Sequence, residues 1–582
     1  MHLRNLPMLC FEFADSTGKI QPLTFQKPMK VIKAHKIDDV LPCFQMVQEA
    51  VDDGYYAAGF LSYESAPAFD SAYKVKAGGK MPLLWFGIFQ EPLHQAIGGK
   101  DSMYTLTDWK PSVSMDEYNR AITGIKHAIE HGDTYQSNYT IRLNSSFQGN
   151  ELAFFEKLKA AQASNYCAYI NTGAHSILSA SPELFFHLKD DRITTRPMKG
   201  TVKRGKTWGE DQAIADWLYH SEKNRAENLM IVDLLRNDLG MIAEPGTVSV
   251  SKLFEIEHYP TVHQMTSTIT AQVSPAIKLV DIFRALFPCG SITGAPKIST
   301  MNIISELENS PRDVYCGAIG FITPGKEAIF NVPIRTVFIE HQTGQATYGV
   351  GGGITWDSTT EGEYAEILAK ARLLEENRPE FQLLESLLWD NGSYFLLEEH
   401  LNRLNRSAQY FGFSFVLDNV RQALHNFSAT LEKGQFKVRL LLAKDGRVTI
   451  EGTPIAKSDP LVKVVLADKP VDKENLFLYH KTTNRDIYSE FQAKKPADAF
   501  DVLLWNQDGE LTEFTNGNLV VEMDGQLWTP SLTSGLLAGT YRDWLLNSGE
   551  IREKTLTLGD LEKATKIWFI NSVRKWLEVQ LS

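Results

Sequence analysis

Apolar and polar positions follow two periods along this chain, and the two periods are interleaved. A period near two predicts strands within residues 72–89, 167–188 and 328–340. Apolar residues three and four positions apart predict amphipathic helices within residues 114–132 and 226–240 and in a segment that begins at Asp357. Because strands follow strands instead of alternating with helices, the pattern favours an α+β fold over a doubly wound parallel sheet.

The pattern breaks near residue 380. A charged helical segment stops before Pro379, and an alternating segment starts at about Phe381. Beyond the break, Asn-Gly within residues 389–397 and Asp-Gly within residues 436–450 lie between apolar arms, which indicates hairpins. The sequence therefore predicts two domains, residues 1–378 and residues 381–582, each mixing helices and strands.

The composition and net charge of the chain limit the classes of binding partner that we expect. The 582 residues are 43% hydrophobic, and 59 Lys and Arg stand against 71 Asp and Glu, a net charge of −12. This balance argues against nucleic acid or an anionic membrane as the main partner. The five cysteines form no Cys-x-x-Cys pair, which is typical of reduced thiols. No apolar run reaches about 18 residues, so we expect a soluble, cytoplasmic protein without a membrane span.

Three carboxylates and a glycine turn form the first candidate site. Glu363 and Glu366 are three positions apart on one face of a predicted helix, and Glu227 opens another. Gly351–Gly353 precede the first of these helices and would let backbone N–H groups approach an anion. Acidic residues near a helix N-terminus also stabilise the helix by complementing its dipole. For any one of these three residues alone, that is the better explanation. Together, carboxylates beside an anion-binding turn favour a bridging Mg²⁺.

Seven blocks then follow one another in a fixed order: SASPELFF, RPMKGT, AENLMIVDLLRNDLG, FPCGSITGAPKISTM, YCGAIGF, VPIRTVF and YGVGGGITWDSTTEGEYAE. Over about residues 100–375 they resemble the chorismate-utilising enzymes, which include anthranilate synthase component I, aminodeoxychorismate synthase component I, isochorismate synthase and salicylate synthase. The resemblance implies an α/β sandwich that binds chorismate with Mg²⁺. It assigns the metal to Glu227 and Glu366 with Glu363 close by, and the substrate to Arg335, Tyr315, Thr293, Gly351, Gly352 and Gly353.

Lys199, in PMKGT, distinguishes the branches of this family. Alone it would be a solvated surface charge. Anthranilate- and isochorismate-forming members resemble PxAGT, whereas aminodeoxychorismate synthases resemble PxKGT. The resemblance implies that Lys199 attacks C2 of chorismate and expels the C4 hydroxyl, after which ammonia enters at C4 and displaces the lysine. Burial beside Mg²⁺ and Arg335 would favour the neutral amine that this attack requires.

Two further positions bear on the same reaction. The resemblance makes Glu183 the general acid/base for the leaving hydroxyl, although without it Glu183 would be a strand-end surface acid. Gln264 stands where the family has a histidine credited with helping pyruvate leave in anthranilate formation. Glutamine cannot act as an acid, which suits a product that keeps its enolpyruvyl group. Because His263 is the adjacent residue, the family's histidine could also align with His263 instead of Gln264. On its own, His263 is more simply explained as a structural histidine.

The second domain carries its own blocks: EEHLNRLNRSAQYFG, LYHKTTNRDIY and GELTEFTNGNLVVEMDGQLWTPSLTSGLLAGTYR. They resemble the fold-type IV pyridoxal-phosphate enzymes, which include branched-chain and D-amino-acid aminotransferases and aminodeoxychorismate lyase. The resemblance implies that Lys481 forms the Schiff base, that Glu513 keeps the pyridine nitrogen protonated, and that the remaining members bind the phosphate. These phosphate-binding residues are Arg403, Asn518 and Thr540.

Two details of this second domain stay open at this stage. Many relatives read Gly-x-Thr-Arg where this chain reads GTYR, so Thr540 stands one position early and its hydroxyl contact is in doubt. Arg542 and Arg574 would suit a substrate carboxylate, and solvated surface positions explain them equally well.

The presence of both domains in one chain limits the reactions that we expect of it. The product expected of the Lys199 domain, 4-amino-4-deoxychorismate, is the substrate of the lyase branch of the second family, so we expect a bifunctional enzyme that makes 4-aminobenzoate for folate. The alternatives are an anthranilate synthase component I-like domain fused to an amino-acid aminotransferase, and a ligand-binding regulator without activity. No cysteine has a GxCxG setting, so ammonia is expected from solution or from a separate glutamine amidotransferase. Fold-type IV domains usually dimerise, which makes a homodimer an expectation.

Overall fold

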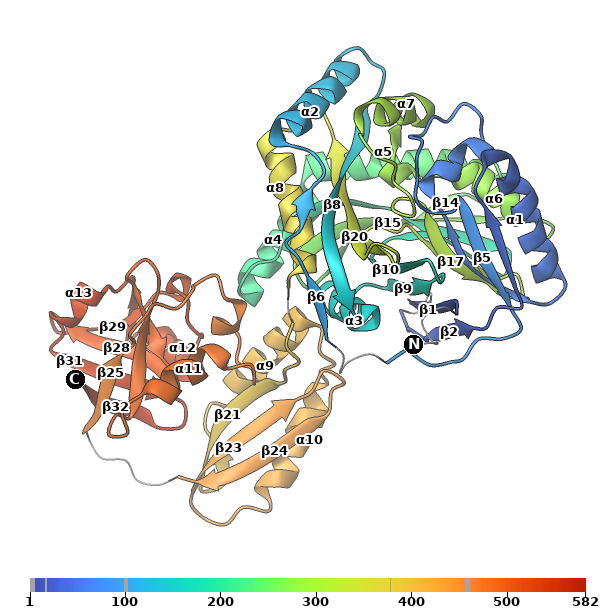
Figure 1. Ribbon diagram of the computed structural model, residues 1–582. Coiled ribbons are helices and arrows are strands. Elements are labelled where there is room, and N and C mark those ends of the chain that lie inside the picture. Colours follow the sequence, from blue (N-terminus) through green and yellow to red (C-terminus); the bar gives the residue numbers. More distant parts are fainter. Residues whose placement is uncertain (1–5, 16–17, 99–102, 377, 456–460) are drawn as a thin grey trace. The chain divides into compact units, whose positions relative to one another are not determined.

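The structure is a computed structural model that describes residues 6–15, 18–98, 103–376, 378–455 and 461–582 (Figure 1). The chain divides into two compact units. Unit 1 contains residues Met1–Arg204 and Ala215–Arg378, and unit 2 contains Gly205–Ile214 and Pro379–Ser582. Among the described residues, no helix combines the length and apolar character needed to cross a bilayer.

Unit 1 contains two antiparallel sheets, and the first includes the long strand β8. In spatial order its strands are β16 (Gly294–Ala295), β8 (Gln136–Gly149), β20 (Gln345–Ile354), β19 (Thr336–Glu340), β10 (His175–Ser181), β9 (Tyr166–Asn171), β1 (Met8–Phe13) and β2 (Leu23–Gln26); β6 (Tyr104–Leu106) and β7 (Lys110–Pro111) also pair with β8.

The second sheet of unit 1 contains β13 (Met198–Lys203), β15 (Val262–Gln272), β12 (Arg192–Arg196), β11 (Leu184–Lys189), β18 (Ala328–Asn331), β17 (Ala318–Ile322), β4 (Tyr56–Leu61), β5 (Leu84–Phe89) and β3 (Lys30–Ala34), with β14 (Ser249–His258) paired to β15. One buried cluster draws on both sheets: Phe11 and Phe25 from the first, and Phe60, Phe89 and Phe321 from the second. Apolar faces meet between the sheets, so unit 1 is a sandwich.

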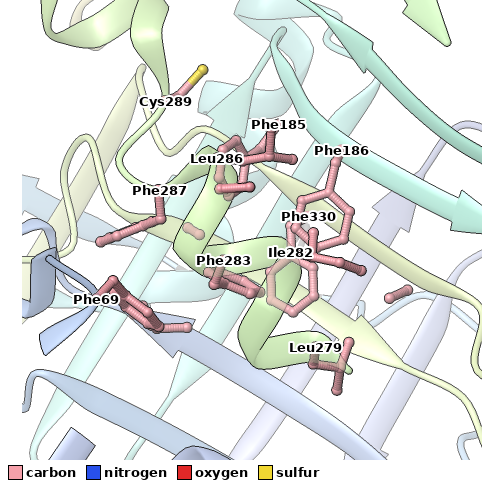
Figure 2. Close-up of a cluster of buried hydrophobic side chains, with 14 of the residues drawn as sticks. Phe69, Phe185, Phe186, Leu279, Ile282, Phe283, Leu286, Phe287, Cys289 and Phe330 are labelled. Carbon is pink, nitrogen blue, oxygen red and sulfur yellow. The ribbon is translucent and has the colours of Figure 1, made fainter. Parts of the chain in front are cut away.

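Helices cover the outer faces of this sandwich. They are α1 (Ile37–Asp52), α2 (Met115–Glu130), α3 (Glu151–Gln162), α5 (Glu222–Gly240), α6 (Leu279–Leu286), α7 (Lys297–Leu307) and α8 (Thr360–Ala371), with the 3₁₀ turns η1 (Tyr63–Ala68), η2 (Gly290–Ile292) and η3 (Arg372–Leu374). Helix α4 (Trp208–His220) begins in the segment assigned to unit 2 and ends in unit 1. Figure 2 shows α6 against the second sheet, where the Phe283 ring lies 5.5 Å from that of Phe186 and 5.2 Å from that of Phe330. Such edge-on contacts fix α6 beside the loop that leads to η2.

Unit 2 contains two sheets. The smaller one has β22 (Ser393–Tyr394), β21 (Leu383–Asp390), β23 (Gln435–Leu442) and β24 (Val448–Pro454), and its core includes residues of α9 (Leu397–Phe411) and α10 (Leu417–Ser428). The larger one has β27 (Leu511–Phe514), β26 (Asp501–Trp505), β25 (Leu461–Leu466), β32 (Lys575–Leu581), β31 (Lys566–Asn571), β28 (Gly517–Met523), β29 (Gln526–Pro530) and β30 (Arg552–Lys554).

The larger sheet closes on itself because β27 also pairs with β28. Apolar residues from each strand of this ring, among them Val464, Leu503 and Phe569, form its core. A closed ring has no exposed edge between β27 and β28. The remaining elements of unit 2 are α11 (Asp486–Lys494), α12 (Thr540–Asn547), α13 (Leu558–Leu561), η4 (Leu476–Leu478) and η5 (Leu532–Ser534).

The α+β class and the sandwich are confirmed, and two local expectations need correction. Within residues 72–89 only Leu84–Phe89 is a strand, because Gly78, Gly79 and Pro82 interrupt the alternation. The hairpin within residues 389–397 has a second arm of only two residues, β22, before α9 begins at Leu397. The Asp-Gly hairpin forms as predicted, from β23 and β24.

Candidate active sites

A cavity of about 350 Å³ in unit 1 gathers the predicted residues of the first site. Residues on its wall come from β13, β20, α5, α8 and the loops before β11, β17 and β19. They are Glu183, Lys199, Glu227, Tyr315, Arg335, Gly351, Gly352, Gly353, Glu363 and Glu366. Thr293 is the exception: it does not line the cavity, and its buried hydroxyl donates to the carbonyls of Cys289 and Gly290.

Gly351–Gly353 do not form the expected turn but lie within strand β20, paired with β8. Because they carry no side chains, the reactive groups around them can converge. A Cβ atom on Gly353 would lie 3.0 Å from Lys199 Nζ and 1.8 Å from Gln136 Nε2. A Cβ atom on Gly352 would lie 3.3 Å from Glu363 Oε2 and 3.5 Å from Glu366 Oε1. A side chain at Gly353 would therefore occupy the space that the lysine amine and the amide of Gln136 use.

Lys199 and Glu183 both have unusual charge states. Burial lowers the pKa of the Lys199 amine, and the carboxylates of Glu227 and Glu183 oppose this shift. Burial raises the pKa of Glu183 to about 7, with a bond from Ser291 acting the other way. Glu183 is 2% exposed, and its Oε1 has no hydrogen-bond partner among the described residues. The cavity thus combines an amine that loses its proton readily with a carboxyl that keeps one.

Glu227, Glu363 and Glu366 line the cavity as candidate ligands of a divalent cation, and one of them is already paired with a lysine. Lys370, one turn after Glu366 on α8, forms an ion pair with that residue and donates to the Gly351 carbonyl over 2.8 Å. Lys370 lowers the pKa of Glu366, whereas burial raises those of Glu227 and Glu363. An oxygen donor set of this kind suits Mg²⁺, which would compete with Lys370 for Glu366.

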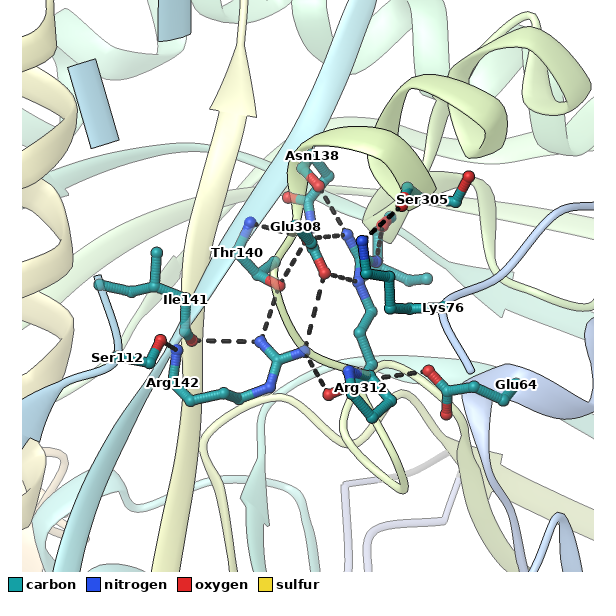
Figure 3. Close-up of polar contacts among 12 residues, drawn as sticks. Glu64, Lys76, Ser112, Asn138, Thr140, Ile141, Arg142, Ser305, Glu308 and Arg312 are labelled. Atoms are coloured by element: carbon teal, nitrogen blue, oxygen red, sulfur yellow. Dashed lines mark hydrogen bonds and ion pairs between the residues drawn. The ribbon is translucent and has the colours of Figure 1, made fainter. Parts of the chain in front are cut away.

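A buried ionic network contacts the part of the cavity wall that Asn138 and Ile292 form (Figure 3). The Arg312 guanidinium, fully buried, donates to Glu308 and to the carbonyls of Ile292 and Asn138 over 2.7–3.1 Å. Glu308 also accepts from the amide and the hydroxyl of Thr140. Asn138 and Ile292 line the cavity, so this network ties β8 to the loop at η2.

Further side chains line this cavity or contact the residues that line it. Arg142 lies over the Tyr315 ring at 5.3 Å, and Arg335 donates to the Lys370 carbonyl. Gln264 lines the cavity and its amide bonds Thr201 and the Gly200 carbonyl, on the strand that carries Lys199. His263 is not part of the wall.

Unit 2 holds a second cavity, of about 660 Å³, and every residue predicted for the cofactor lines it: Arg403, Lys481, Glu513, Asn518 and Thr540. Burial, reinforced by Arg403 and Arg485, lowers the pKa of Lys481 to about 7. Burial raises the pKa of Glu513 to about 7, and this carboxyl accepts a 2.8 Å bond from the Tyr488 hydroxyl.

The residues expected to bind phosphate lie on the wall of this cavity near the start of α12. A Cβ atom on Gly539 would lie 1.9 Å from Asn518 Oδ1, so glycine is needed for the backbone to pass this close. Arg403 donates to the Ala538 carbonyl and, through two bonds, to the carboxylate of Glu385. The donor set, with a buried lysine that readily becomes neutral and an acid opposite it, fits pyridoxal phosphate.

The structure distinguishes the two arginines, Arg542 and Arg574, whose roles the sequence left open. Arg574 lines the second cavity. Arg542 is 2% exposed and does not line it, because its guanidinium turns away to the Pro530 carbonyl and Glu553. The sequence reading missed Lys370, Gln136, Tyr488 and Glu385. Only Lys370 had a signal, its spacing of four from Glu366.

Comparison with known proteins identifies a family for each of the two parts of the chain. Residues 9–376 match the chorismate binding enzyme family, and residues 382–581 match amino-transferase class IV. Since the first match spans more than half of the residues, the chain belongs to the chorismate binding enzyme family. The class IV match implies pyridoxal phosphate as the cofactor of the second part.

Two of the similar proteins share one name, and a similar solved structure carries another. Aminodeoxychorismate synthase component 1 of Salmonella typhimurium is 42% identical over 262 residues, 45% of this chain and 57% of that protein. Its Escherichia coli K12 counterpart is 40% identical over 275 residues, 47% of this chain and 60% of that protein. The chain thus spans less than two thirds of these relatives. Anthranilate synthase component I of Streptococcus pneumoniae TIGR4 superposes with a TM-score of 0.53 at 25% identity, covering 63% of this chain and 90% of that one.

Proposed function

We propose that the chain converts chorismate and ammonia to 4-amino-4-deoxychorismate in unit 1 and converts that product to 4-aminobenzoate and pyruvate in unit 2. The observation that carries the proposal is the position of Lys199 Nζ, 3.0 Å from the point where Gly353 would carry a Cβ, in one cavity with Glu183 and three carboxylates. The two activities are assigned to residues 1–378 and 381–582.

In the first reaction Lys199 is the nucleophile. Its neutral amine bonds to C2 of chorismate, the ring double bond shifts, and the C4–O bond breaks. Glu183, protonated near neutral pH, gives its proton to the leaving hydroxyl, so that water departs. Ammonia then bonds to C4, the double bond shifts back, and the bond from Lys199 to C2 breaks, which releases the lysine as a neutral amine. The nitrogen now on C4 gives its extra proton back to Glu183. The enolpyruvyl group at C3 is retained throughout.

Other residues of unit 1 bind and orient the substrate. Arg335, Tyr315 and Gly351–Gly353 of β20 are proposed to hold the carboxylate-bearing end of chorismate. Glu227, Glu366 and Glu363 would hold Mg²⁺, which neutralises the substrate carboxylate when bound. Without a cation, these carboxylates would repel that group.

In unit 2 the cofactor supplies an electron sink when bound. Lys481 would hold it covalently and then, released, take the C4 proton of the substrate. Glu513 would keep the proton on the pyridine nitrogen, with Tyr488 bonded to its carboxylate. Removal of the C4 proton is followed by loss of the enolpyruvyl oxygen from C3, which makes the ring aromatic.

Ammonia must reach the first site from outside. We propose that it comes from solution or from a separate glutamine amidotransferase subunit, in line with the component 1 naming of the relatives. A homodimer formed through unit 2 is proposed from the habit of fold-type IV proteins.

Complementation between two variants tests the whole proposal. With chorismate, Mg²⁺ and a low ammonium concentration, Lys481→Ala is expected to consume chorismate and accumulate 4-amino-4-deoxychorismate. Lys199→Ala is expected to leave chorismate but to process supplied 4-amino-4-deoxychorismate. Mixing the two proteins should restore 4-aminobenzoate. If Lys481→Ala still forms 4-aminobenzoate at the parental rate, unit 2 is not the lyase, and an amino-acid aminotransferase becomes the better assignment.

A further inference from the structure

Glu513, the acid proposed to face the pyridine nitrogen, is held by a buried tyrosine from another element. Tyr488 lies on α11 and is 6% exposed, and its hydroxyl donates to Glu513 Oε1 over 2.8 Å. Both residues line the second cavity. Glu513 Oε2 lies 3.4 Å from Asn518 Nδ2, whose shorter bond, of 2.9 Å, goes to the Leu537 carbonyl. Tyr488 is therefore the closer of these two side-chain donors, and Oε2 keeps the greater capacity for a further donor.

Packing fixes the tyrosine ring in this position. Arg485 lies over the ring at 4.5 Å from its centre, and the same guanidinium donates to the Thr515 carbonyl. Tyr488 also belongs to a buried cluster with Leu478 and Phe491. Burial is the main cause that raises the pKa of the Tyr488 hydroxyl well above its ordinary value. The hydroxyl therefore keeps its proton, and towards a carboxylate, which only accepts, it is the donor.

We propose that Tyr488 is a positioning residue, whose hydrogen bond keeps Glu513 ionised and so leaves the shared proton on the pyridine nitrogen of pyridoxal phosphate. The inference rests on the proposed cofactor site. One proton lies either on the nitrogen, opposite a carboxylate, or on the carboxyl group, opposite a neutral ring. A hydrogen bond from Tyr488 stabilises the carboxylate more than the neutral carboxyl group, and so favours the first arrangement. The protonated ring is the stronger electron sink.

The surroundings of Glu513 explain why this single bond matters. Burial raises the pKa of Glu513 to about 7, and the Tyr488 hydroxyl is the largest of the causes that lower it, ahead of the Leu537 backbone, Arg485 and Lys481. A carboxyl group whose pKa is raised this far competes with a pyridine nitrogen for the proton. A hydrogen bond to a charged group is expected to shift that competition towards the protonated ring by about 10–100-fold.

The position of the proton can be measured directly. The full chain, freed of cofactor, is reconstituted with pyridoxal phosphate that carries ¹⁵N in the ring. The ¹⁵N chemical shift is then recorded, because it differs strongly between a protonated and a neutral pyridine nitrogen. Tyr488→Phe should move the signal towards that of Glu513→Gln, which has no carboxylate and serves as the neutral reference. It should also lower kcat for supplied 4-amino-4-deoxychorismate about tenfold and leave KM unchanged, because no group proposed to bind the substrate is removed.

Tyr479→Phe is the matched control. Tyr479 belongs to the same buried cluster, but its hydroxyl donates to the Lys473 carbonyl over 2.9 Å and it does not line the cavity. This variant should lower the melting temperature about as much as Tyr488→Phe and keep the parental ¹⁵N signal and kcat. An unchanged signal in Tyr488→Phe, beside a shifted one in Glu513→Gln, would overturn the inference and leave the proposed function standing. Failure of the parental chain to bind pyridoxal phosphate would overturn the proposed cofactor site, and this inference with it.

Discussion

Glu183 and Lys199 show how a folded site shifts the pKa values of ionisable side chains away from those they have in water. Burial is the main cause of both shifts: it raises the pKa of Glu183 to about 7 and lowers that of Lys199. The proposed reaction needs both changes, since one group must give a proton and the other must lack one.

Glu183 leads to a prediction about pH. Since its carboxyl pKa is raised to about 7, the protonated acid is lost as pH rises through that value, and chorismate consumption should fall on the alkaline side. Lys199 acts in the opposite sense, because its neutral fraction grows with pH. Glu183→Gln should lower kcat by about 10²–10⁴-fold and remove the alkaline limb near pH 7. An unchanged alkaline limb in this variant would show that another group is the acid.

Lys199 gives a second prediction. Lys199→Ala should nearly abolish 4-amino-4-deoxychorismate formation at low ammonia, because the covalent step is lost. Lys203→Ala is the control, since Lys203 lies on the same strand but does not line the cavity. Formation rates are followed by chromatography. Equal rates for Lys199→Ala and the parental chain would refute the nucleophile assignment.

The site residues that could be predicted from the sequence are those that belong to multi-residue sequence blocks. Lys481 and Glu513 were found this way, and both line one cavity. Tyr488 and Gln136 were not found, because a single tyrosine or glutamine carries no spacing signal; only the fold brings them to Glu513 and Gly353. Thr293 was predicted from its block and lies one residue beyond the wall that Ile292 forms.

At the scale of elements, periodicity predicted strands wherever alternation was uninterrupted. β9, β10 and β11 all fall within the segment 167–188, apart from a residue at either end. Partners of strands could not be predicted, because β8 pairs with β20 some 200 residues later in the sequence and the period of two carries no information on partners. The buried ionic network that contacts β8 could not be predicted from the sequence either.

The network behind β8 gives a prediction at this scale. Arg312→Lys keeps a charge near Glu308 but loses the planar fork that reaches Asn138 and Ile292. It should destabilise unit 1 by about 1–3 kcal/mol and raise the chorismate KM on the order of tenfold. Lys297→Met, which breaks the buried pair with Asp238 away from the cavity, should destabilise as much and leave KM unchanged. Equal KM changes in both would mean that stability alone is responsible.

At the scale of the whole molecule, the account requires two sites with separate chemical needs. The first depends on carboxylates that suit Mg²⁺, and the second has no such cluster among the residues that line it. EDTA should therefore stop chorismate consumption and leave the conversion of supplied 4-amino-4-deoxychorismate to 4-aminobenzoate intact. Both rates are measured on one preparation by absorbance and chromatography. Loss of both activities in folded protein that retains its cofactor would contradict independent sites.

Product analysis tests the central claim most directly. The purified chain is mixed with chorismate, Mg²⁺ and an ammonium salt, and the aromatic products are separated and identified by mass and retention time. The account predicts 4-aminobenzoate and pyruvate in equal amounts, with no anthranilate, since Lys199 directs nitrogen to C4. Anthranilate as the product, or chorismate left unchanged by a folded, cofactor-loaded protein, would contradict it.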